Sequence, residues 1–172
     1  SEAKGLLLSS IMSDDPVIFL EYRSLYNTKE HVDVNPYFIE LRKPRKRLDG
    51  KDITVVAAGA SVLTCLQASN ILKKKNINIE LFDLRTLTSI KMEKIFSSIK
   101  KTQRILVVED GWLRGGYGSE IITMVLEQGL TLKSNPKRIS WPNSHLPMSQ
   151  PLEKNFYFTS KDISEACVKL VT

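Results

Sequence analysis

Residues 105–122 read ILVVEDGWLRGGYGSEII, and the fold of the chain follows from this stretch. Its first four residues are a continuous apolar run, which is typical of a short strand buried on both faces. Glu109 and Asp110 are predicted to end this strand, and a glycine-rich loop follows over residues 111–118. An amphipathic helix is then predicted over residues 119–128. In an open parallel sheet such a loop lies at the carboxyl edge of the strands, where ligands and partners usually bind.

The glycine-rich loop lacks the two common phosphate-binding signatures. No Gly-Lys-Ser/Thr follows it, as a Walker loop requires, and it contains no Gly-x-Gly-x-x-Gly. We therefore expect its glycines to serve turn geometry and close packing. Anion binding by backbone N–H groups at the start of the helix is the alternative.

Four residues near this edge are candidates for lining a cleft or an interface: Glu109, Trp112, Gly116 and His145. Glu109 and its neighbour Asp110 could perform acid–base chemistry if one of them had a raised pKa. The more common role of such a pair is to accept hydrogen bonds from loop N–H groups or to cap a helix. Trp112 is either an exposed contact residue or packed on the helix. His145 lies in a proline-rich loop that follows a predicted strand.

In the rest of the chain, short apolar runs typical of strands alternate with segments that have the apolar spacing of helices. Buried strands are predicted over residues 53–58, 77–82 and 137–141, and helices over 61–72, 89–99 and 159–171. Thr159 and Asp162 have the spacing of a capping box. This alternation predicts an α/β fold of three layers, in which a mainly parallel sheet carries helices on both faces.

The first fifty residues follow a different pattern. Residues 1–12 are predicted to be helical, and 17–20 and 37–41 to be short strands. We expect residues 1–22 to be the end of a domain whose beginning is missing, 23–50 to be a linker, and 51–172 to be one domain. The chain is therefore interpreted as a piece of a larger protein.

Composition narrows the class of protein. The chain has 172 residues and a formal charge of +6, and no apolar run is long enough to span a membrane. Basic residues cluster at 42–47, 73–75 and 100–101, without the interleaved aromatic residues that stack on bases. Solvated basic surface is the favoured interpretation, acidic protein partners come next, and nucleic acid is disfavoured. Cys65 and Cys167 are predicted to be buried thiols, and Asp83 with Arg85 to form an ion pair.

Several segments resemble one family, in order and with its spacing. They are AKGLL (3–7), DPVIFLE (15–21), GKDITVV (50–56), DLRTL (83–87), GGYGSEI (115–121) and PLE (151–153). These segments are similar to the beta subunit of thiamine-dependent 2-oxo acid dehydrogenases. Residues 1–22 resemble the end of its pyrimidine-binding domain, and residues 51–172 resemble its transketolase-type C-terminal domain.

The resemblance implies a division of labour between chains. The intact enzyme would use thiamine diphosphate and Mg²⁺, bound mainly outside this stretch, and would pass an acyl group to lipoamide. It implies no catalytic or cofactor-binding residue here. The implied partners are a second beta subunit, an alpha subunit and the subunit-binding domain of a lipoyl acyltransferase, with no nucleic acid and no membrane. The implied compartment is the cytoplasm or an organelle matrix, mitochondrial or plastid.

The resemblance also suggests a monovalent cation site, with K⁺ as the expected ion. Ser10, Ser13 and Asp15 occupy the matching positions, although Ser13 stands where relatives carry Asp. Glu109-Asp-Gly-Trp112 resembles pyruvate-type subunits more than branched-chain ones. Met148 stands where an aromatic residue or His is expected, which bears on substrate choice.

Three other interpretations remain open. One is another transketolase-type enzyme, such as deoxyxylulose-phosphate synthase or a small transketolase half. The second is a non-enzymatic docking module. The third, a nucleotide-binding flavodoxin-like domain, would require a phosphate loop that the sequence does not contain.

Overall fold

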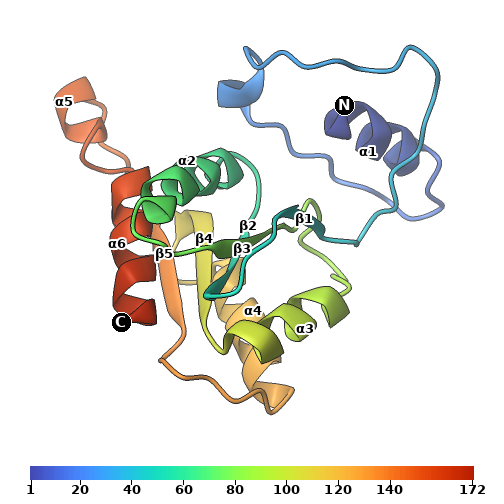
Figure 1. Ribbon diagram of the computed structural model, residues 1–172. Helices are drawn as coiled ribbons and strands as arrows, with labels where there is room; N and C mark the ends of the chain where they lie inside the picture. The colour runs from blue at the N-terminus through green and yellow to red at the C-terminus, as the bar shows by residue number, and fades with distance from the viewer.

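The computed structural model describes residues 1–172, and its centre is a five-stranded sheet (Figure 1). The strand order is β1-β3-β2-β4-β5. β2 (Ile53–Ala57), β3 (Ile79–Asp83), β4 (Ile105–Trp112) and β5 (Lys137–Trp141) run parallel, and β1 (Arg45–Leu48) pairs antiparallel with β3. The predicted α/β class with a mainly parallel sheet is confirmed.

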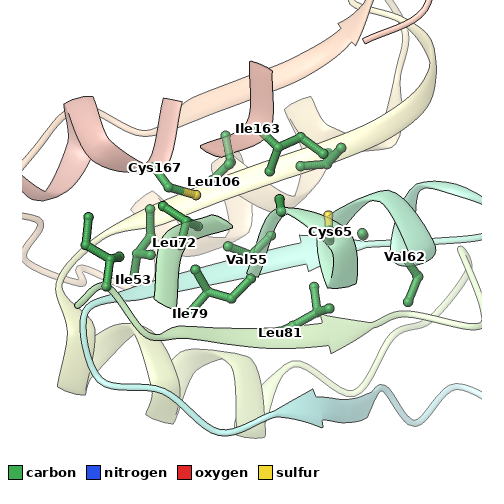
Figure 2. Packing of buried hydrophobic residues seen from close by; sticks show 14 residues of the cluster. Ile53, Val55, Val62, Cys65, Leu72, Ile79, Leu81, Leu106, Ile163 and Cys167 are labelled. Atoms are coloured by element: carbon green, nitrogen blue, oxygen red, sulfur yellow. The ribbon is translucent and has the colours of Figure 1, made fainter. Parts of the chain in front are cut away.

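Helices cover both faces of the sheet, as predicted. α2 (Ser61–Lys73) and α6 (Ser160–Val171) pack on one face, and α3 (Glu93–Thr102) and α4 (Tyr117–Glu127) on the other (Figure 1). β2 is buried along its whole length, which explains why its sequence is apolar except for Thr54. Figure 2 shows the core under α2 and α6, where Cys65 and Cys167 are both buried free thiols, as predicted.

Two predicted strands are wrong. Residues 17–20 and 37–41 form no strand, because no neighbouring strand supplies hydrogen-bond partners. The side chain of Ile18 is 88% exposed, so this apolar run is not buried in the chain described here. The antiparallel edge strand is instead β1, whose sequence Arg-Lys-Arg-Leu carries the charged side chains common on edge strands.

Among the helices, α3 shows the largest difference between the predicted and the observed start. The helix was predicted to start at Ser89, but it begins at Glu93 after Met92. Ser89 has φ +50, in the left-handed region, and therefore lies in a bend before the helix. The capping box of α6 is confirmed: Thr159 and Asp162 exchange side-chain and backbone hydrogen bonds.

The N-terminal segment contains α1 (Glu2–Ile11) and the 3-10 turn η1 (Arg23–Leu25) and lies beside the β1 edge (Figure 1). Arg85 was predicted to pair with Asp83, and this is wrong. Its guanidinium donates to Glu2 of α1, at 3.0 Å, and to the Lys43 carbonyl, while only its backbone N–H reaches Asp83. Arg85 therefore fastens the N-terminal segment to the sheet edge. The domain boundaries stay a prediction.

A short helix, α5 (Gln150–Glu153), stands away from the layers, within the loop between β5 and α6 (Figure 1). None of the helices combines the length and the apolar character that crossing a membrane requires.

A buried polar network joins β2, β3 and α3. Glu80 is 3% exposed. Its carboxylate accepts a hydrogen bond from Ser98 at 2.7 Å and forms an ion pair with Lys101 at 2.5 Å. The Thr54 hydroxyl lies 2.7 Å from those of Ser98 and Thr102. Burial alone would raise the pKa of Glu80, but Lys101, Ser98 and Lys46 outweigh it and hold the pKa below its usual value.

Replacing Glu80 by Gln should lower the free energy of unfolding at pH 7 by about 1–3 kcal/mol, because a charged hydrogen-bonded network is broken. A carboxyl with a lowered folded-state pKa stabilises the protein above its unfolded pKa, about 4.3, and this stabilisation is lost on acidification. Urea denaturation at several pH values should therefore show the difference shrinking below pH ~4. A pH-independent difference would contradict this account of the network.

Candidate site at the carboxyl edge of the sheet

β4 is longer than its sequence pattern predicts. It continues through Glu109 and Asp110 to Trp112, with an irregularity in its pairing to β5 between Val108 and Trp112. The prediction that Glu109 and Asp110 end the strand is therefore wrong. Only residues 113–116 form the loop before α4. Because successive side chains on a strand point to opposite faces, the two carboxylates reach different helices.

Glu109 points toward the start of α4. Its side chain is 1% exposed, and Oε2 accepts a hydrogen bond from the backbone N–H of Gly118 at 2.9 Å. Oε1 is buried without a hydrogen-bond partner. Burial raises the pKa of Glu109, although the Gly118 N–H and the charge of Arg138 act in the opposite direction. Glu109 therefore caps α4 from the sheet.

Asp110 points toward the start of α2. Its Oδ2 accepts a hydrogen bond from the backbone N–H of Ser61, the first residue of the helix, at 2.7 Å. The Ser61 hydroxyl donates to the Ala58 carbonyl at 2.6 Å. Burial raises the pKa of Asp110, and hydrogen bonds from Ser61 lower it in part. The role of the carboxylate pair as helix caps is thus the one that the structure supports.

The glycines at this edge fit the prediction of close packing. A Cβ on Gly118 would lie 2.9 Å from Glu109 Oε1 and 3.0 Å from Arg138 Cδ. A Cβ on Gly116 would lie 2.7 Å from Glu109 Cδ. Gly111, in contrast, has open space where a Cβ would lie. The backbone can approach the buried carboxylate because Gly116 and Gly118 have no side chain.

Trp112 and the loop that contains His145 lie together at the surface. The indole Nε1 of Trp112 donates to the Ser144 carbonyl at 3.2 Å, and the side chain is 51% exposed. His145 is exposed. Glu109 is buried and Gly116 is half-buried beside it, so only Trp112 and His145 of the four candidate residues are exposed. Whether they line a functional cleft or interface stays a prediction.

Three residues that lie at this edge were not predicted from the sequence to do so. Tyr22, from the N-terminal segment, covers the Gly59 turn: Gly59 has φ +63, and a Cβ there would overlap the Tyr22 ring. Ser61 is the α2 donor to Asp110. Arg138 donates to the Leu113 carbonyl at 2.8 Å and to the Ser119 hydroxyl. Only Ser61, next to a predicted strand–helix turn, gave any sequence signal.

The proposed cation ligands are partly engaged in other contacts. The Ser10 hydroxyl donates to the Leu6 carbonyl at 2.8 Å within α1. The Ser13 hydroxyl accepts from the Asp15 N–H at 3.2 Å, and the Asp15 carboxylate pairs with Arg42 at 2.7 Å. The Arg42 guanidinium thus neutralises Asp15, the one charged residue among the three. In this arrangement, these residues do not fit a cation. The cation site stays a prediction.

The chain was compared with known proteins. The family profile described as "Transketolase, C-terminal domain" matches residues 43–163. The mitochondrial pyruvate dehydrogenase E1 component subunit beta of Dictyostelium discoideum is 32% identical over 99% of this chain and 49% of its own length. The acetoin:2,6-dichlorophenolindophenol oxidoreductase subunit beta of Bacillus subtilis is 34% identical over 99% of this chain and 50% of its own length.

A third relative, the pyruvate dehydrogenase E1 component subunit beta of Bacillus subtilis, is 33% identical over 99% of this chain and 53% of its own length. Among solved structures, one described as "Split gene transketolase, inactive beta4 tetramer" aligns with a TM-score of 0.69 and 23% identity. It covers 83% of this chain and 46% of that one. The chain spans about half the length of the curated relatives that it matches.

Replacing Gly118 by Val should reduce the yield of folded protein and lower the free energy of unfolding by about 1–3 kcal/mol, since the new side chain would overlap Glu109 and Arg138. Gly111→Val is the matched control, because a Cβ there meets nothing. Chemical denaturation of the two variants should separate them clearly. Equal stability would show that the close approach at Gly118 is not required.

Replacing Glu109 by Gln should leave the stability at pH 7 unchanged or raised, because the amide keeps an acceptor for Gly118 without a buried charge. A carboxyl with a raised folded-state pKa costs stability above its unfolded pKa, and this cost disappears on acidification. The wild type should therefore gain stability relative to the variant as the pH falls from 7 toward ~4. If denaturation curves showed that the wild type loses stability relative to the variant as the pH falls, Glu109 would not have the raised pKa of a buried carboxyl.

Proposed function

Because the chain belongs to the transketolase C-terminal domain family, we propose that it is the C-terminal part of the beta subunit of a thiamine diphosphate-dependent 2-oxo acid dehydrogenase. Pyruvate is the proposed substrate of the intact enzyme. One observation carries the proposal: pyruvate dehydrogenase beta subunits match almost the whole chain at 32–35% identity. The proposed location is the cytoplasm or an organelle matrix, and one relative is named as mitochondrial.

The carboxyl edge supports a structural role for this part of the subunit. Glu109 and Asp110 both accept hydrogen bonds from helix N-termini. Asp110 lies beside the Ser61 hydroxyl, but this hydroxyl donates to the Ala58 carbonyl, and Glu109 is closed to solvent. General acid–base catalysis requires a group within hydrogen-bond reach of the substrate. We therefore assign the chemistry to the rest of the enzyme and assembly to this part.

The residues present do not fit the cofactor of the proposed enzyme. Thiamine diphosphate supplies an electron sink for decarboxylation when it is bound. Its diphosphate needs Mg²⁺ held by free oxygen ligands, and no group of acidic, His or Cys side chains in this chain is arranged to hold a metal ion. We propose that the cofactor and Mg²⁺ are held mainly by other parts of the enzyme.

Partners are proposed to meet the exposed apolar side chains at the carboxyl edge. Trp112 is 51% exposed, Met148 98%, and Leu152 of α5 is also exposed. Large exposed apolar side chains are candidates for contacts with other chains. The proposed occupants are a second beta subunit, the alpha subunit and the subunit-binding domain of a lipoyl acyltransferase.

A second candidate is the beta subunit of an enzyme that acts on acetoin. The acetoin oxidoreductase subunit beta matches this chain as well as the pyruvate-type subunits do, at 34% identity. Met148, where the sequence departs from the expected pattern, favours neither substrate. Turnover of the intact enzyme with pyruvate, a branched-chain 2-oxo acid and acetoin separates the alternatives.

Isothermal titration of this chain with the subunit-binding domain of a lipoyl acyltransferase should show saturable binding that weakens as salt is added. Charged rim contacts at such interfaces are screened by salt. Trp112→Ala should reduce the affinity if the carboxyl edge takes part, and Leu126→Ala, an exposed apolar residue at the far end of α4, serves as the control. Absence of binding by the chain and by the intact enzyme would count against the dehydrogenase assignment.

Thiamine diphosphate with Mg²⁺ provides the second arm of this test. A ligand that binds the folded state raises the melting temperature. We expect no rise for this chain alone and a clear rise for the intact enzyme. A rise for the chain alone would contradict the assignment of the cofactor site to the rest of the enzyme.

A further inference from the structure

The edge of the sheet opposite the candidate site carries a row of lysines. Lys75 precedes β3, Lys51 precedes β2, and Lys133 and Lys137 precede and begin β5. All four are exposed, and none of them takes part in an ion pair. We call them the amino-edge lysines, because the amino ends of the parallel strands meet at this edge.

Backbone hydrogen bonds hold these loops side by side. The Asn78 carbonyl accepts from Lys51 N–H at 3.2 Å, which joins the loops before β2 and β3. Thr54 N–H donates to the Arg104 carbonyl at 3.0 Å, and Lys133 N–H donates to the Gln103 carbonyl at 2.8 Å. Neighbouring strands lie about 4.8 Å apart, so the row from β3 to β5 spans about 14 Å.

Helix dipoles account for only part of this row. α2 and α3 also end at this edge, and their negative ends explain the lysines of their last turns, such as Lys73 and Lys100. Lys75 belongs to the turn that closes α2, since its N–H donates to the Leu72 carbonyl at 2.8 Å, whereas the other three amino-edge lysines lie away from helix ends. Two nearby acidic side chains already form ion pairs with other lysines: Asp49 pairs with Lys46 at 2.5 Å, and Glu80 pairs with Lys101.

The remaining acidic side chains are few. Asp52 accepts from Asn78 N–H at 2.7 Å, and Glu127 ends α4. Arg104 adds a further positive charge between β2 and β5, with its guanidinium held by the carbonyls of Leu170 and Val171. Lysine and arginine side chains therefore outnumber the unpaired carboxylates at this edge, in line with the formal charge of +6 for the chain.

We propose that the amino edge binds an extended acidic segment of a partner protein. An extended peptide advances about 3.3 Å per residue, so about five residues rich in Asp and Glu would span the row. A protein partner is favoured over nucleic acid because bases stack on exposed aromatic side chains, and the amino edge has none. The exposed aromatic residues all lie outside the loops that precede the parallel strands: Tyr22, Tyr26, Phe38, Trp112 and Tyr157.

A hollow of mixed polar and apolar lining at the end of the row fits the same occupant. It has a volume of about 480 Å³ and is lined by Leu126, Leu130 and Leu132 together with Lys133, Ser134, Asn135 and Pro136. The three leucines offer contacts to an apolar side chain that stands next to carboxylates, which a peptide can supply and a nucleic-acid backbone cannot. This surface is separate from the carboxyl edge, and its function does not depend on the substrate of the enzyme.

The test is fluorescence anisotropy with a labelled peptide of about ten residues, alternating Glu and Leu, titrated with this chain. Changing Lys51, Lys75 and Lys133 together to Glu should weaken binding at least tenfold. Changing Lys29, Lys154 and Lys161 to Glu is the control, since it alters the net charge equally at other places; it should weaken binding less than about threefold.

A milder triple variant, with Gln in place of Glu at the same amino-edge positions, keeps the test valid if charge reversal impairs folding. It should give an intermediate loss of affinity. Equal losses in the amino-edge and control variants would overturn the proposal, because they would indicate general charge attraction. Tighter binding of duplex DNA, lost in the same variants, would also overturn it.

Discussion

Two adjacent carboxylates at the end of β4 hold the helices on both faces of the sheet. Glu109 accepts the N–H of Gly118 at the start of α4, and Asp110 accepts the N–H of Ser61 at the start of α2. The first N–H groups of a helix have no partner within the helix and need one from elsewhere. Neither helix has a cap from its own N-cap residue, so the strand supplies it.

This arrangement determines what the carboxyl edge can do. The carboxylates that most resembled an acid–base pair are committed to holding helices, and the buried one is shielded by Gly116 and Gly118. Trp112 and His145 remain at the surface and are suited to contacts with other chains. The opposite edge of the sheet carries the unpaired lysines. The two edges of the sheet therefore differ in chemistry, with an exposed indole and imidazole at one and exposed lysines at the other.

Local periodicity was enough to predict most of the fold. β2, β5, α2 and the capping box of α6 follow from apolar spacing and from Thr159 and Asp162. The apolar residues 17–20 were misread because a strand depends on a neighbour, and none is present. A capping role for Glu109 and Asp110 was predicted, but not the helices that they cap, since Asp110 and Ser61 are 49 residues apart and the strand end gives no sign of the helix that it will meet.

Native-state hydrogen exchange at the amides of Ser61 and Gly118 tests the central claim most directly. If the two carboxylates fix both helices, these amides should exchange only when the whole domain unfolds, with an opening free energy equal to that of the β4 core. Exchange as fast as in the exposed loop around His145 would contradict the claim, because it would show that the helix starts open independently of the sheet.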